Sequence, residues 1–106
     1  SEEEIAKVVA AIRTHRFSEG LEPTSLEGHI LSDADKLDAI GAVGIFRSIA
    51  QATVSGRGTS GFLQHADEKL LKLKDLMYSD DAREMAIERH SFLEAFVNRL
   101  KDEVQF

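Results

Sequence analysis

Residues 31–45 constrain the fold of this chain most, because three aspartates lie among apolar residues at helical spacing. The segment reads LSDADKLDAIGAVGI and contains Asp33, Asp35 and Asp38. At about 100° per residue, Asp33 shares a helix face with the apolar residues Ile30, Leu37 and Ile40. Asp35 points to nearly the opposite face. A helix with apolar residues on both faces is expected to lie centrally in a bundle. A carboxylate there needs a positive partner or hydrogen-bond donors, since an uncompensated buried charge is costly.

Apolar residues recur at helical spacing along the rest of the chain, and no alternating strand-like run occurs. We therefore predict an all-α domain of about five helices. The first is expected to run from a capping box at Ser1 to near His15, and the second to begin at Thr24 or Ser25. The last is expected to follow Ser79 and to bury one apolar stripe. That stripe comprises Met85, Phe92, Leu93, Phe96, Val97 and Leu100.

Glycines divide the middle of the chain. Gly41 and Gly44 lower the helix propensity and predict a break or a close helix–helix contact. Residues 54–61 contain three more glycines and predict the longest flexible stretch. A further helix is then expected over residues 62–77.

The composition limits the function classes. The net charge is −6 and there is no basic run, which disfavours extended nucleic acids and anionic membrane surfaces as partners. The chain has no cysteine, which excludes disulfides, thiolate zinc sites and cysteine nucleophiles. There is no apolar run of about 18 residues and no signal-peptide pattern, so we expect one cytoplasmic domain without a membrane partner.

Several segments together carry a family resemblance. Residues 30–47 follow the pattern D-A-D-R/K-L-D-A-I-G-A-I-G with a closing arginine. Residues 12–18 follow I-x-x-H-x-F-S, residues 64–77 follow a Q-H…E-K-L-L-x-L helix, and residues 86–93 match a closing helix. In this order the segments resemble a bacterial and archaeal subgroup of the HD-domain metal-dependent phosphohydrolases. The resemblance covers essentially the whole chain and implies an HD-like helical bundle.

The resemblance also implies a site. In that superfamily the last metal ligand is the aspartate of an A-D-K/R-L pattern, which makes Asp35 the expected catalytic metal ligand. The implied cofactor is a divalent ion (Mg, Mn, Co, Ni or Fe). The implied substrate is a small phosphate ester or anhydride, with nucleotides among the candidates. Asp33 and Asp38 belong to the subgroup pattern and are expected beside the metal ligand or on the substrate side.

Other polar residues allow two interpretations. His15 is either a further metal or phosphate contact or a helix-end histidine that interacts with the helix dipole. Lys69, Lys72 and Arg89 suit phosphate binding, but could equally form ion pairs with the acidic cluster. From the residues alone, Asp33 is favoured as a buried cap or ion pair that braces a neighbouring helix or loop.

The chain departs from the family in one respect. The histidine and the His-Asp pair that give the superfamily its name do not occur in this sequence, whose histidines are His15, His29, His65 and His90. We therefore expect residues 1–106 to form the C-terminal portion of an HD domain, incomplete at its N-terminus and inactive alone. Its uncovered apolar face would favour homo-oligomers. The alternative is a non-catalytic helical interaction module in which Asp33 and Asp35 are structural.

Overall fold

Helices make up nearly all of the part of the chain that the computed structural model describes, namely Ile5 and residues 24–105. The elements are α2 (Leu26–Ile40), α3 (Ala42–Val54), α4 (Gly58–Glu68), the 3-10 helix η1 (Leu70–Leu76) and α5 (Asp80–Val104). No strand occurs among these residues, which confirms the predicted all-α class. The expected first helix and His15 lie outside the described residues.

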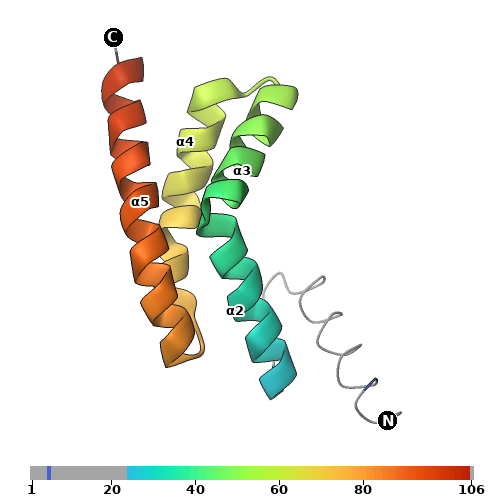
Figure 1. Ribbon diagram of the computed structural model, residues 1–106. Helices are drawn as coiled ribbons and strands as arrows, with labels where there is room; N and C mark the ends of the chain where they lie inside the picture. Colours follow the sequence, from blue (N-terminus) through green and yellow to red (C-terminus); the bar gives the residue numbers. More distant parts are fainter. Residues whose placement is uncertain (1–4, 6–23, 106) are drawn as a thin grey trace.

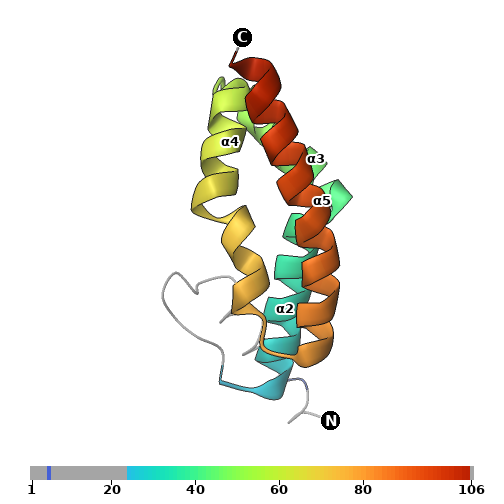
Figure 2. The same ribbon diagram turned by 90° about the vertical axis from the view of Figure 1, so that its left-hand side faces the viewer.

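The long helix α5 organises the bundle. It lies alongside α4 and η1 over much of its length and alongside α2 near its N-terminal end (Figures 1 and 2). Helix α3 continues from α2 and pairs with α4. Serine side chains begin two of the helices as predicted, since Ser25 accepts a hydrogen bond from Gly28 and Ser79 accepts one from Ala82.

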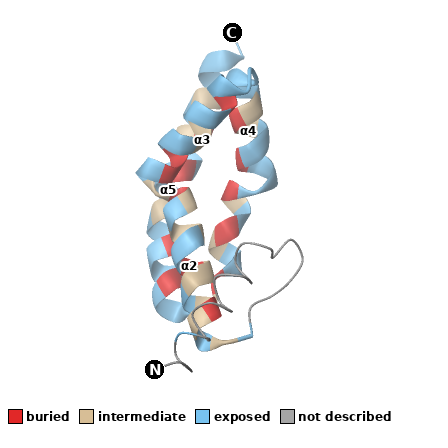
Figure 3. Ribbon diagram, turned by 90° about the vertical axis from the view of Figure 1, so that its right-hand side faces the viewer, coloured by how far each residue is buried: buried red, intermediate tan, exposed pale blue. Residues whose placement is uncertain are grey.

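The core lies where these elements face one another. Its most completely buried large side chains are Ile40, Phe62, Leu70, Leu93 and Val97. In Figure 3 the buried positions lie on the sides of the helices that face the middle of the molecule. Phe96 is half-buried and packs edge-on against Phe62, with ring centroids 5.9 Å apart. Each buried side chain of this size contributes about 1.5–3 kcal/mol.

The junction between α2 and α3 is the break that the glycines predict. The two helix axes differ by 68° across Gly41. A Cβ atom on Gly44 would overlap the backbone oxygen of Asp38 and would lie 2.7 Å from that of Ala39. Gly44 is therefore required by the close approach of α3 to the last turn of α2.

The expected flexible stretch and the helix after it are placed wrongly. Gly56 and Gly58 have positive φ angles of 79° and 58°, so the chain reverses within residues 55–57 and α4 already begins at Gly58. The predicted helix over 62–77 is two elements, because α4 ends at Glu68 and a 3-10 helix follows. Leu70 and Leu73 are both buried, and in a 3-10 helix residues three apart lie directly above one another.

Three apolar residues of the predicted apolar faces are exposed, namely Ile30, Met85 and Phe92. Only a narrow stripe of α5 is fully buried, because the neighbouring elements pack against one side of it. Among the described residues, no single helix is long and apolar enough to cross a membrane, although α2 and α3 taken together as a bent pair meet that criterion.

Candidate functional site

Asp33 braces the start of α5. The residue is 5% exposed, and its two carboxylate oxygens accept hydrogen bonds from the backbone N–H groups of Tyr78 and Ser79 at 2.7 and 3.0 Å. Ser79 is the N-cap of α5, so the carboxylate of α2 holds the turn that leads into this helix. The predicted buried brace is confirmed, and its partners are backbone amides. Both oxygens are engaged inside the fold, which fits a structural role better than a substrate contact.

Asp35 and Asp38 lie on the other side of α2 and are exposed. Arg47 of α3 donates a 2.7 Å hydrogen bond to Asp38, and this bond lowers the pKa of the Asp38 carboxyl. The same bond raises the pKa of Arg47, and the charge of Asp35 contributes to that shift as well. Asp35, Asp38 and Arg47 thus form one charged group beside the α2–α3 bend, which we call the acidic face. Arg47 is the closing arginine of the pattern over residues 30–47, but it was not predicted to be a site residue.

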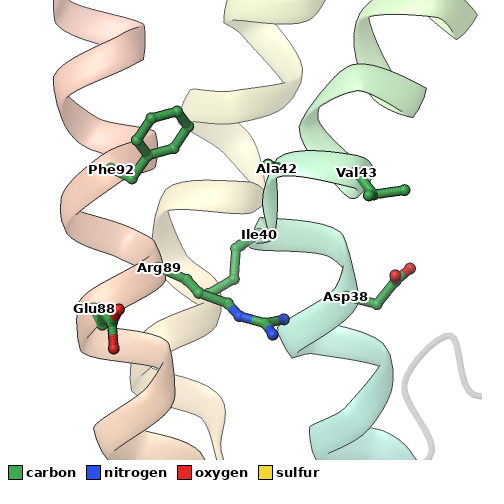
Figure 4. Close-up of a pocket in the computed structure, with 8 residues that line it drawn as sticks. Asp38, Ile40, Ala42, Val43, Glu88, Arg89 and Phe92 are labelled. Atoms are coloured by element: carbon green, nitrogen blue, oxygen red, sulfur yellow. The ribbon is translucent and has the colours of Figure 1, made fainter.

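Arg89 reaches this bend from α5. Figure 4 shows its side chain extending from α5 toward α2. The guanidinium donates to the backbone oxygen of Leu37 at 2.5 Å, and its positive charge also lowers the pKa of Asp38. Gly41 leaves room for it, because a Cβ atom there would lie 3.2 Å from the Arg89 Nη1 atom. Arg89 is therefore the one predicted cation that the described structure brings to the acidic aspartates.

A hollow of about 480 Å³ surrounds Arg89. Exposed apolar side chains, Val43 from α3 and Phe92 from α5, line it together with Asp38 and Glu88. An arginine among carboxylates and apolar groups can orient a polar ligand whose other end is apolar.

Lys69 and Lys72 are not brought to the acidic face. Lys69 caps the C-terminal end of α4 and Lys72 lies in η1, and both residues are exposed. None of the ion pairs found within the described ranges involves either lysine. His15 lies outside these ranges.

A second contact between α2 and the turn before α5 was not anticipated. Lys36 donates to the backbone oxygen of Leu76 at 2.7 Å and lies 4.7 Å from the ring centroid of Tyr78. His29 stacks on the same Tyr78 ring, with the two ring centroids 4.0 Å apart. Residues 33 and 36 therefore hold the same turn, which leaves Asp35 and Asp38 on the open side of the helix.

The described residues do not form a complete metal site. No group of three or more histidine, aspartate and glutamate side chains within them is arranged to hold an ion. Asp35 has an exposed carboxylate, and such an oxygen ligand suits a hard divalent cation. One carboxylate would leave most coordination positions of the cation without a protein ligand. Any further protein ligands would have to come from outside the described ranges.

Comparison with known sequences finds a relative of this chain. No protein-family model matches the sequence. The chain is 49% identical over 87 residues to the uncharacterized protein YpgQ of Bacillus subtilis, an alignment that covers 78% of this chain and 42% of the relative. The chain thus spans less than half the length of the curated relative that it matches.

Solved structures agree with this similarity. The crystal structure of Bacillus subtilis YpgQ in complex with ADP superimposes with a TM-score of 0.83 at 37% identity, over 97% of this chain and 54% of that one. Another crystal structure of YpgQ gives a TM-score of 0.83 at 36% identity, over 98% of this chain and 56% of that one. This chain therefore has the fold of about half of YpgQ.

Proposed function

We propose that this chain is part of a metal-dependent phosphohydrolase of the HD type that acts on a phosphate ester or anhydride, with nucleoside phosphates as the leading class. The observation that carries the proposal is the match of 97% of the chain, at a TM-score of 0.83, to a YpgQ structure solved with ADP. ADP contains a phosphoanhydride, which is the kind of bond that the sequence resemblance implies as the substrate.

The acidic face supports this assignment chemically. Asp35 would be one ligand of a divalent ion, which supplies Lewis-acid polarisation of a phosphoryl oxygen and activation of water. Arg47 uses one N–H group for Asp38, and the guanidinium fork carries further donors that suit phosphate oxygens. Arg89, held by the Leu37 carbonyl, adds a second fixed positive charge beside Asp38.

The test is phosphate release from ADP and ATP by the full-length protein that carries this chain, with Mn²⁺ and then with EDTA. We expect chelation to stop hydrolysis and Asp35→Asn to reduce it by about a hundredfold or more, since the metal ligand is lost. The matched control is Asp67→Asn, because Asp67 is an exposed aspartate on α4 that pairs with Lys101. Hydrolysis that survives both EDTA and Asp35→Asn would contradict the proposal.

A second candidate function is a helical interaction module. Three apolar residues near the α2–α3 bend are exposed, Val43 by 70%, Phe46 by 73% and Phe92 by 58%. If this face binds a second copy, sedimentation should show concentration-dependent association that Phe46→Ser weakens. Val54→Ser should leave association unchanged, because Val54 is equally exposed but lies at the far end of α3.

A further inference from the structure

A second hollow, between α3 and α4, is lined by cationic and hydrogen-bonding side chains. Its polar lining consists of Arg47, Ser48, Gln51, Arg57 and His65, which we call the arginine pocket. Ala52 and Phe62, both buried in the core, also line it, and its volume is about 340 Å³. No acidic side chain lines this hollow in the part of the chain that the structure describes. This composition contrasts with the net charge of −6 of the whole chain.

The backbone and its neighbours hold Arg57 at this pocket. Its backbone N–H donates to the oxygen of Ala52 at 2.8 Å, and its Nε donates to the hydroxyl of Ser55 at 3.3 Å. Gly61 lies directly under the arginine stem, since a Cβ atom on Gly61 would overlap the Arg57 Cβ atom and lie 3.4 Å from Cγ and Cδ. The glycine therefore allows the stem of Arg57 to lie across the first turn of α4.

Positive charges from two neighbouring residues act on His65 at the edge of this pocket. Burial lowers the pKa of His65, and the charges of Lys69 and Arg57 lower it further. Glu68 acts in the opposite direction, although its carboxylate also accepts a hydrogen bond from Gln64. Arg47 faces the pocket from α3. A bound anion would relieve the repulsion among these cations.

We propose that the arginine pocket binds a phosphate group. Arg47 and Arg57 both line the pocket, and each guanidinium keeps N–H donors beyond those used for Asp38 and Ser55, which suit the oxygens of a tetrahedral oxyanion. Ser48 and Gln51 add neutral donors. Arg47 also donates a hydrogen bond to Asp38 and interacts electrostatically with Asp35. A phosphate bound in the arginine pocket would therefore lie beside the acidic face. Assigning this group to a substrate phosphoanhydride rests on the proposed function, whereas anion binding itself does not.

The experiment is an NMR titration of the isotopically labelled 106-residue chain with pyrophosphate in the presence of EDTA. We expect saturable shifts of the His65 ring and of the Arg57 side chain, and a higher pKa of His65 at saturation. Arg57→Gln should weaken binding about tenfold or more, because it removes charge-assisted hydrogen bonds. Gly61→Ala should also weaken it by displacing Arg57. The matched control is Arg99→Gln, an exposed arginine paired with Glu103 on α5, which should change the affinity less than about twofold.

Two results would overturn the proposal. One is the absence of a saturable shift at His65, and the other is equal weakening by Arg57→Gln and Arg99→Gln, which would indicate diffuse attraction only. The source of the phosphate is tested with ADP and adenosine. ADP should shift the same resonances and compete with pyrophosphate, while adenosine should not. If the pocket binds pyrophosphate but does not bind ADP, the assignment of the bound phosphate to a nucleotide substrate would be overturned. Because EDTA is present throughout, a failure of metal-dependent hydrolysis would leave these readouts unaffected.

Discussion

Two aspartates separated by a single residue have opposite environments. Asp33 is buried and accepts two backbone hydrogen bonds, whereas Asp35 is exposed on the acidic face. The helical period places the two residues on nearly opposite faces, and the turn before α5 covers only the face that carries Asp33. The same carboxylate group therefore supports folding at one position and is exposed to solvent at the other.

Asp33→Asn should destabilise the chain by about 1–3 kcal/mol, because an amide NH₂ group would then face one of the two backbone donors and leave it unsatisfied. Asp35→Asn should change the free energy of unfolding by less than about 0.5 kcal/mol, as is typical of exposed substitutions. Urea unfolding of the two variants side by side measures the difference. Equal losses would mean that the structural role is not confined to Asp33.

His65 should make stability depend on pH. Its pKa in the folded chain lies below the ordinary value of 6.5, so the unfolded chain binds a proton more readily. Neutral His65 therefore contributes to the stability of the folded chain above pH 6.5. This stability is lost as the pH falls from that value through the lower pKa of the folded chain. Wild-type stability should therefore decrease on acidification more than that of His65→Gln, as measured by thermal melts. Parallel pH profiles for the two proteins would contradict this.

The α2–α3 bend is the element that arranges the acidic face. It places Arg47 of α3 against Asp38 of α2, and it opens the space that Arg89 enters from α5. A continuous helix would place residues 38 and 47 about 13 Å apart along its axis, too far for an ion pair. The geometry of the charged group therefore depends on the close contact at Gly44.

Gly44→Ala should destabilise the chain by about 1–3 kcal/mol, because the new methyl group overlaps backbone atoms that cannot move independently. Gly41→Ala should cost less, since its nearest new contact is the flexible end of Arg89 at 3.2 Å. Urea unfolding of both variants tests this order. A greater loss for Gly41→Ala would show that the Arg89 contact, rather than the backbone approach, determines the bend.

At the scale of the whole molecule, side chains of α2 hold this helix to the turn before α5. Asp33 and Lys36 hold α2 to the turn before α5, so the exposed aspartates have a fixed support. One exposed carboxylate cannot by itself provide the coordination that a divalent ion requires. The matching YpgQ chain is nearly twice as long as the part that this chain covers.

The 106-residue chain alone should bind Mn²⁺ weakly, with a dissociation constant well above about 1 μM, and should not hydrolyse ADP, because ligands from several elements are needed for tight binding. Calorimetric titration with Mn²⁺ and a phosphate-release assay test both points. Stoichiometric sub-micromolar binding that Asp35→Ala abolishes would instead reveal a self-sufficient site.

The sequence by itself determined the features that depend on neighbours within a few residues. Helical spacing predicted the all-α class, Ser25 and Ser79 begin α2 and α5 as capping residues, and Gly41 and Gly44 predicted the break. These features follow from the helical period, from capping and from the missing Cβ atom, all of which act locally.

Only the tertiary structure decided which groups meet across elements. The period of a helix shows which residues share a face but not whether a neighbour covers that face, so Ile30 and Phe92 were expected to be buried and are exposed. Likewise, the capping of the α5 turn by Asp33 spans 45 residues, and the arginine pocket exists only because α3 and α4 lie side by side. Such contacts depend on the packing of the whole bundle, which short-range sequence patterns do not encode.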